Sequence, residues 1–147
     1  MATRARWVRG LSLWGPPAIY ALAIFGFSSL SAPPVPPPQL TDKHVHLLVF
    51  AGFALVLVRA LANGRWSDVT LATGVRAATL AIAYGATDEW HQSFVPGRDA
   101  NLLDLAADAV GVLVAVGLLC TAAWWGRRTG QANGRIERAV GKVGQTP

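Results

Sequence analysis

The residues that could carry chemistry are concentrated in one stretch of the chain, residues 88–111. This stretch holds five of the eight acidic residues, one of the three histidines and a Pro-Gly-Arg turn, and it lies between two long apolar runs. A charge at the depth of a bilayer costs roughly 2.5–3.5 kcal/mol even on lenient insertion scales. We therefore expect acids that are kept in such a position to have a function.

These groups suggest proton transfer and anion binding. Carboxylates that lie close together and partly out of water do not hold their protons equally, so one can act as an acid and another as a base. The candidate catalytic residues are Glu89, His46, Asp104 and Asp108. The candidate anion-binding residues are Arg98 and Lys43, and the arginine can hold a phosphate or carboxylate through two hydrogen bonds. Whether a reaction is catalysed stays open.

Helical spacing places several of these groups one turn apart. Asp104 and Asp108 share a face of one helix, as do Asp42 and His46 on another. Gly111 lies near the first of these faces and would let another helix approach closely. Structural explanations compete here, because Asp42 and Asp104 can also be first-turn acids behind the helix caps Thr41 and Asn101. For His44 and His91 we favour the interpretation that they are interfacial polar groups without a functional role.

Residues 95–98, Val-Pro-Gly-Arg, fit a type II turn with proline second and glycine third. The turn would present Arg98 beside the carboxylates. Glu89 is expected at the C-terminal end of a helix, where the helix dipole disfavours an anion. It therefore needs a partner such as Arg98, Lys43 or a protonated histidine.

A metal site is a further alternative, with His46, Glu89, Asp104 and Asp108 as ligands. Nitrogen and oxygen ligands suit zinc or manganese, but no spacing such as His-Glu-x-x-His is present. The single cysteine, Cys120, excludes an intramolecular disulfide and a cysteine-based metal site. We assign no metal and no cofactor.

The composition predicts a membrane protein. Hydrophobic residues make up 52% of the chain and charged residues 14%, against about a quarter charged in soluble domains. Four apolar runs predict an all-α bundle of four transmembrane helices with short loops, at residues 10–32, 44–61, 69–87 and 101–125. We divide the chain into residues 1–9, an N-terminal segment; 10–125, the four-helix domain; and 126–147, a flexible tail. Residues 32–40, with five prolines, should be an extended connector.

Two features of the first apolar run indicate whether it is retained as a helix or cleaved as a signal peptide. Pro16 and Pro17 should kink a retained helix or mark its first turn. The alternative is a cleaved signal peptide, because small residues precede Pro33; we favour a retained span.

The cations predict the orientation of the chain. Eleven of the thirteen lysines and arginines fall towards one face of the bundle, and only Lys43 and Arg98 towards the other. By the positive-inside rule both termini are cytoplasmic in a multi-pass protein of the cell membrane. Six acids and all three histidines then gather on the outer side. The cations form no basic face with interleaved aromatic residues, so nucleic acid is not an expected partner.

The acid-rich motifs resemble the signature of the VanZ-like family of small bacterial membrane proteins. The matching positions are Asp42, Lys43, His46, Asp88, Glu89, Gln92, Phe94, Pro96, Gly97, Arg98, Asp104 and Gly111. Asp108 departs from the pattern, which has asparagine there. The resemblance implies an envelope protein and a possible link to glycopeptide (teicoplanin) resistance, without supplying a reaction.

Two functions are compatible with these observations. The first is an outward-facing polar pocket that binds or processes an anionic lipid-linked or cell-wall precursor group. The second is a non-catalytic membrane scaffold that contacts envelope proteins, in which the polar cluster only holds helices together. The expected partners are the lipid bilayer and either a lipid-linked cell-wall precursor or envelope proteins. The oligomeric state stays open.

Overall fold

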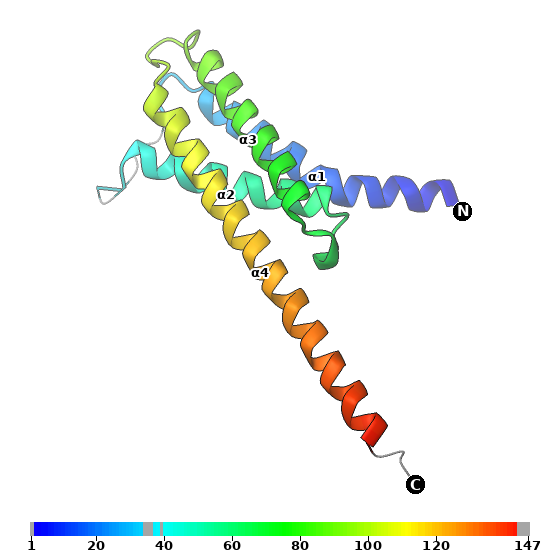
Figure 1. Cartoon of the computed structure of the whole chain (residues 1–147). Coiled ribbons are helices and arrows are strands. Elements are labelled where there is room, and N and C mark those ends of the chain that lie inside the picture. Colours follow the sequence, from blue (N-terminus) through cyan, green and yellow to red (C-terminus); the bar gives the residue numbers. More distant parts are fainter. Residues whose placement is uncertain (1, 34–36, 39, 144–147) are drawn as a thin grey trace.

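The chain is described by a computed structural model that places the backbone of residues 2–33, 37–38 and 40–143. Within these residues it is all-α, as predicted. The elements are α1 (Ala2–Ser28), α2 (Asp42–Leu61), the short 3-10 helix η1 (Trp66–Asp68), α3 (Leu71–Gln92) and α4 (Leu102–Val143) (Figure 1). The proline-rich connector lies partly outside the described residues.

Three helical segments are long and apolar enough to cross a membrane: Thr3–Ser28, Asp42–Leu61 and Leu102–Gln131. The chain is thus a multi-pass membrane protein. α3 is not among the three although it has 22 residues, because Arg76, Asp88 and Glu89 lower its hydropathy. It packs against each of the other helices, and these neighbours cover its two acids.

The interior is made by close helix packing around aromatic side chains. Phe53 of α2 stacks on Tyr20 of α1 and contacts Tyr84 of α3, and the Tyr84 hydroxyl donates to a backbone carbonyl of α1 at 2.7 Å. On α3, Gly74 and Gly85 are three turns apart and both face α4; a Cβ at either would press on α4 side chains. Small residues thus bring α3 close to α4.

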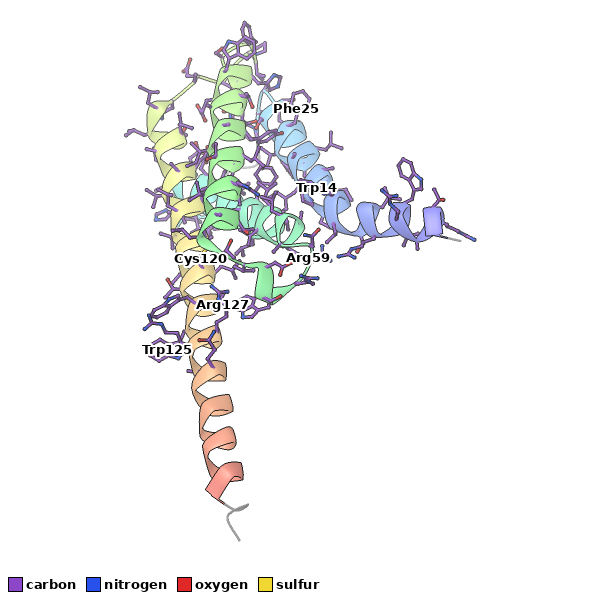
Figure 2. The ribbon with its side chains drawn as sticks, turned by 45° about the vertical axis from the view of Figure 1, so that its right-hand side comes forward. Trp14, Phe25, Arg59, Cys120, Trp125 and Arg127 are labelled. Atoms are coloured by element: carbon purple, nitrogen blue, oxygen red, sulfur yellow. The ribbon has the colours of Figure 1, made fainter. Side chains whose placement is uncertain are left out.

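α1 begins earlier than the sequence predicts. It includes residues 2–9, which we expected as a separate segment, and it contains Pro16 and Pro17. Figures 1 and 2 show its first half turning away from the other helices, with Trp14 near the bend. Proline removes a backbone donor and crowds the preceding turn, so the pair is the physical reason for the bend that was predicted for a retained helix.

α4 ends later than the sequence predicts. We placed its end at residue 125, before the Arg127-Arg128 pair, but the helix continues to Val143 (Figure 1). No proline follows Trp125 within the described residues, and glycine alone weakens a helix without ending it. A change from apolar to polar composition marks a membrane boundary, and a helix can pass through such a boundary.

Candidate functional site

The four helices alternate in direction, so the C-terminal ends of α1 and α3 meet the N-terminal ends of α2 and α4. All the buried polar side chains of the described part of the chain lie at this end of the bundle. They are Ser28, His46, Asp88, Glu89, Gln92, Asp104 and Asp108. The prediction that separate segments bring their acids and histidines to one level is confirmed, and we call this level the polar end.

Two contacts join α2 to α4, and we call their four residues the α2–α4 network. Lys43 donates to Asp104 at 2.5 Å, and His46 Nδ1 lies 3.0 Å from Asp108 Oδ1. Both acids are buried, and Asp108 is fully so. The helical spacing explains the match, because the two acids are one turn apart on α4 and face adjacent positions of α2.

Gly111 sets how close α2 and α4 approach. A Cβ at this position would collide with the backbone carbonyl of Leu47, which lies one residue beyond His46. The close helix approach predicted for Gly111 is therefore present. It brings α2 near enough for its short histidine side chain to reach an acid of α4.

Glu89 has a partner that the sequence analysis did not name. Its Oε2 accepts a hydrogen bond from the backbone N–H of Asn101 at 2.7 Å. Asn101 in turn caps α4, because its side-chain oxygen accepts from Leu103 N at 3.0 Å. We expected a cationic partner for Glu89, but its hydrogen-bond donor is a backbone N–H. The loop that follows α3 passes over the end of this helix and supplies that donor.

Arg98 belongs to a second set of contacts, the Ser28–Arg98 network. Its Nε and Nη2 donate to Gln92 Oε1 at 3.1 and 2.6 Å. The Gln92 amide then donates to Asp88 Oδ2 at 2.9 Å, and Ser28 Oγ of α1 donates to the same oxygen at 2.8 Å. The turn was expected to present Arg98 beside the carboxylates, and in the structure the Gln92 amide lies between Arg98 and the Asp88 carboxylate.

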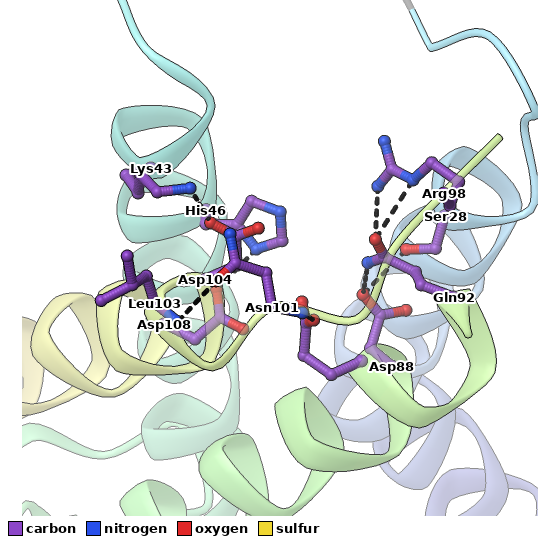
Figure 3. A network of polar contacts seen from close by, with 11 residues as sticks. Ser28, Lys43, His46, Asp88, Gln92, Arg98, Asn101, Leu103, Asp104 and Asp108 are labelled. Atoms are coloured by element: carbon purple, nitrogen blue, oxygen red, sulfur yellow. Dashed lines mark hydrogen bonds and ion pairs between the residues drawn. The ribbon is translucent and has the colours of Figure 1, made fainter.

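The predicted turn explains the position of Arg98. Arg98 N donates to Val95 O at 3.1 Å, and Gly97 has a φ of 81°, as a type II turn requires. The turn returns the chain towards α3, where the Gln92 side chain accepts hydrogen bonds from the guanidinium. Figure 3 shows the two networks side by side, with Lys43 and Arg98 on opposite flanks and Asn101 between them.

Two sets of side chains have the spacing of metal ligands. One potential ligand atom from each of His46, Glu89 and Asp108 lies within 4.8 Å of the others, and the same holds for Asp42, His46 and Asp104. Three buried carboxylate oxygens have no hydrogen-bond partner in the described structure: Asp88 Oδ1, Glu89 Oε1 and Asp108 Oδ2.

Several motif residues lie outside these networks. Phe94 is 68% exposed and packs edge-on against Trp90, and Asp42 is exposed in the first turn of α2. His44 caps its own helix by accepting from Thr41 N at 3.1 Å. His91 lies 3.0 Å from Ser29 Oγ and against Phe25. The structural interpretation of these two histidines is supported by their contacts.

Sequence reasoning missed Ser28 and gave Asn101 only the role of a cap. Nothing in the local sequence distinguishes Ser28 from the serines beside it, and only its position near the end of the first apolar run places it at the level of the acids. The second role of Asn101, as donor to Glu89, depends on the path of the loop and not on residue type.

Comparison with known proteins adds one finding. A family model described as VanZ/LLP1 matches residues 13–124, which include the whole of α2 and α3, parts of α1 and α4, and every residue of both networks. No curated protein and no solved structure matches the chain.

Proposed function

We propose that this chain, which belongs to the VanZ/LLP1 family of membrane proteins, binds an anionic lipid-linked group at the outer rim of its helical bundle. The group we infer is the phosphate of a lipid-linked cell-wall precursor. A protein with this role would alter susceptibility to antibiotics that act on such precursors outside the membrane.

The observation that carries the proposal is the state of Arg98. Its guanidinium is held by a neutral amide oxygen, that of Gln92, and it makes no ion pair with any acid of the described residues. Its charge is therefore fixed in position without being neutralised. Guanidinium binds phosphate through paired N–H donors, and Arg98 keeps donors that Gln92 does not occupy.

Lys43 has a secondary role in this proposal. It is already paired with Asp104, but its side chain is 42% exposed on the same rim. An ammonium that is partly exposed can contact a phosphate with the N–H donors that Asp104 does not occupy. Glu89 and His46, which lie between the two cations, are the groups we assign to any proton transfer.

Binding of a lipid probe tests this proposal. The full chain is placed in phosphatidylcholine nanodiscs and titrated with a fluorescent polyprenyl monophosphate, with the neutral polyprenol as the comparison. Arg98→Ala should weaken phosphate binding about 10- to 100-fold, which corresponds to the roughly 1.5–3 kcal/mol of a hydrogen bond to a charged group. Arg76→Ala is the matched control, since Arg76 is exposed near the start of α3, away from the polar end. Equal binding by Arg98→Ala and wild type would contradict the proposal.

A second candidate function is a non-catalytic scaffold, and the contacts themselves favour it. The two networks tie α1 to α3 and α2 to α4 through Ser28–Asp88, Lys43–Asp104 and His46–Asp108. Polar contacts of this kind hold membrane helices together.

Glu89→Gln separates a scaffold from a site that transfers a proton. The amide oxygen of glutamine can still accept from Asn101 N, so the fold should persist. A scaffold would keep its effect on antibiotic susceptibility in cells, whereas a site that uses a Glu89 proton would lose that effect. Detection of the variant in the membrane fraction at the wild-type amount is the control.

A further inference from the structure

We infer that His46, Glu89 and Asp108 form a binding site for one divalent transition-metal ion, with Zn²⁺ or Mn²⁺ as the class that the ligands fit. This inference does not rest on the proposed lipid function, because it concerns groups in the interior and can be tested without any lipid ligand.

The positions of the side chains are the first observation. Three helices contribute one residue each, His46 from α2, Glu89 from α3 and Asp108 from α4, and all three side chains are buried. A ligand atom from each lies within 4.8 Å of the other two. Ligands at about 2.1 Å from one ion are at most about 4.2 Å apart, so a small inward shift of the side chains is enough to close the site.

The unpaired oxygens are the second, independent observation. Asp108 Oδ2 and Glu89 Oε1 have no hydrogen-bond partner in the described structure, although the two residues are 0% and 6% exposed. Buried charged groups in proteins are normally paired or bound to metal. In each of these carboxylates one oxygen has a hydrogen-bond partner and the other has none. Asp108 Oδ1 contacts His46 Nδ1, and Glu89 Oε2 accepts from Asn101 N.

The free oxygen of Asp108 is directed at the helix that carries Glu89. A Cβ built on Gly85 would lie 3.1 Å from Asp108 Oδ2, and Gly85 is one turn before Glu89 on the same face of α3. Figure 3 shows His46 and Asp108 approaching each other from α2 and α4. The glycine thus leaves room for a carboxylate that points across the interface between α3 and α4.

Charge distinguishes this set from its neighbour. Asp42, His46 and Asp104 are also close together, but Asp42 is exposed and Asp104 is held by the Lys43 ammonium, which would repel a cation. No lysine or arginine of the described residues pairs with Glu89 or Asp108. One imidazole nitrogen and two carboxylate oxygens suit zinc or manganese, and three protein ligands leave a coordination position for water or a substrate group.

Metal binding by the purified chain tests the inference. The full protein is stripped with a chelator in nanodiscs, titrated with Zn²⁺, Mn²⁺ and Mg²⁺, and its bound metal is counted by mass spectrometry. We expect one Zn²⁺ or Mn²⁺ per chain and a higher thermal unfolding midpoint in its presence. Asp108→Asn, Glu89→Gln and His46→Gln should each lower the affinity by at least ~10-fold.

Matched variants decide between the possible outcomes. His91→Gln and Asp42→Asn should bind like the wild type, because His91 contacts the end of α1 and Asp42 belongs to the other set, with His46 and Asp104. Glu89→Gln preserves the acceptor for Asn101 and therefore guards against a variant that merely fails to fold. The inference is overturned if the wild type binds no stoichiometric ion. It is also overturned if Asp42→Asn and Asp104→Asn abolish binding while Glu89→Gln does not.

Discussion

Asp88 shows how a buried acid is accommodated at the polar end. It is 4% exposed, and both of its donors, Ser28 Oγ and Gln92 Nε2, bind the same oxygen, Oδ2. The other oxygen has no partner in the described structure. A buried acceptor that loses its donor retains the full cost of leaving water, so these two hydrogen bonds should matter more than bonds at the surface.

Ser28→Ala should therefore destabilise the protein. The substitution removes the α1 donor to Asp88 and should lower the free energy of unfolding by about 1–3 kcal/mol. Thr121→Ala is the control, because the Thr121 hydroxyl is exposed and donates to the Gly117 carbonyl of its own helix. Thermal unfolding in detergent measures both variants. An equal shift in the two midpoints would show that the Ser28–Asp88 bond adds no stability.

At the residue scale the sequence predicts which groups gather but not how they pair. Lys43, Arg98 and the acids are found at one end because each follows or precedes an apolar run, which is visible in the sequence. The partners of Glu89 and Arg98 are instead a backbone amide and a side-chain amide. Such partners depend on the path of a loop over a few ångströms, and any residue type has a backbone N–H to offer.

At the scale of elements, α2 and α4 form the contact on which the site depends. Gly111 permits it, because the helices meet where a side chain would strike the Leu47 carbonyl. The glycine was predictable from its position near the face of Asp104 and Asp108. The residue that Gly111 contacts, Leu47, was not predictable, since a small residue indicates a close approach but not which residue of the other helix lies there.

Gly111→Ala should disrupt this packing. The new methyl group forces the backbones of α2 and α4 apart, which should cost about 1–3 kcal/mol or more, as overpacking does elsewhere. Gly117→Ala, on the same helix, is the matched control, because a Cβ there meets nothing within 4 Å; it should be neutral or stabilise by up to about 1 kcal/mol through helix propensity. Thermal unfolding midpoints in detergent compare the two. If both alanines behave alike, the close approach at Gly111 is not a stabilising contact.

The helix boundaries show another limit of prediction at this scale. The caps of α2 and α4 and the turn at residues 95–98 follow from residue type, and the structure has them where they were expected. The outer limits of α1 and α4 do not, because hydropathy reports where the lipid ends and a helix does not have to stop there.

At the scale of the whole molecule, charge is distributed between the two ends of the bundle. Beside the polar end stand the cations Lys43 and Arg98. At the opposite end Arg59 donates to the Ser12 carbonyl, Arg127 to the Val69 carbonyl, and Arg65 pairs with Asp68. The pKa of Asp68 is held below its usual range mainly by the hydrogen bond from Arg65. Arginines that satisfy helix ends and loops in this way can also lie among lipid head groups.

This separation predicts the orientation of the chain in the membrane. Because basic residues are retained on the cytoplasmic side, the arginine-rich end should face the cytoplasm and the polar end the exterior. In a Cys120→Ser background, Asp99→Cys should react with a membrane-impermeant maleimide in intact cells. Ser67→Cys should react only after the cells are permeabilised. Both positions are exposed in loops or short turns and lie at opposite ends of the bundle, so they form a matched pair.

The labelling pattern also bears on α3, whose hydropathy alone does not mark it as a span. Residues 67 and 99 lie on either side of α3 in the chain. If they label from opposite sides of the membrane, α3 must cross it, with Arg76 near one surface and the acids near the other. Labelling of both from the same side would mean that α3 does not cross. If Asp99→Cys reacts only after the cells are permeabilised, the polar end faces the cytoplasm, and the proposed binding of a lipid-linked group from outside fails.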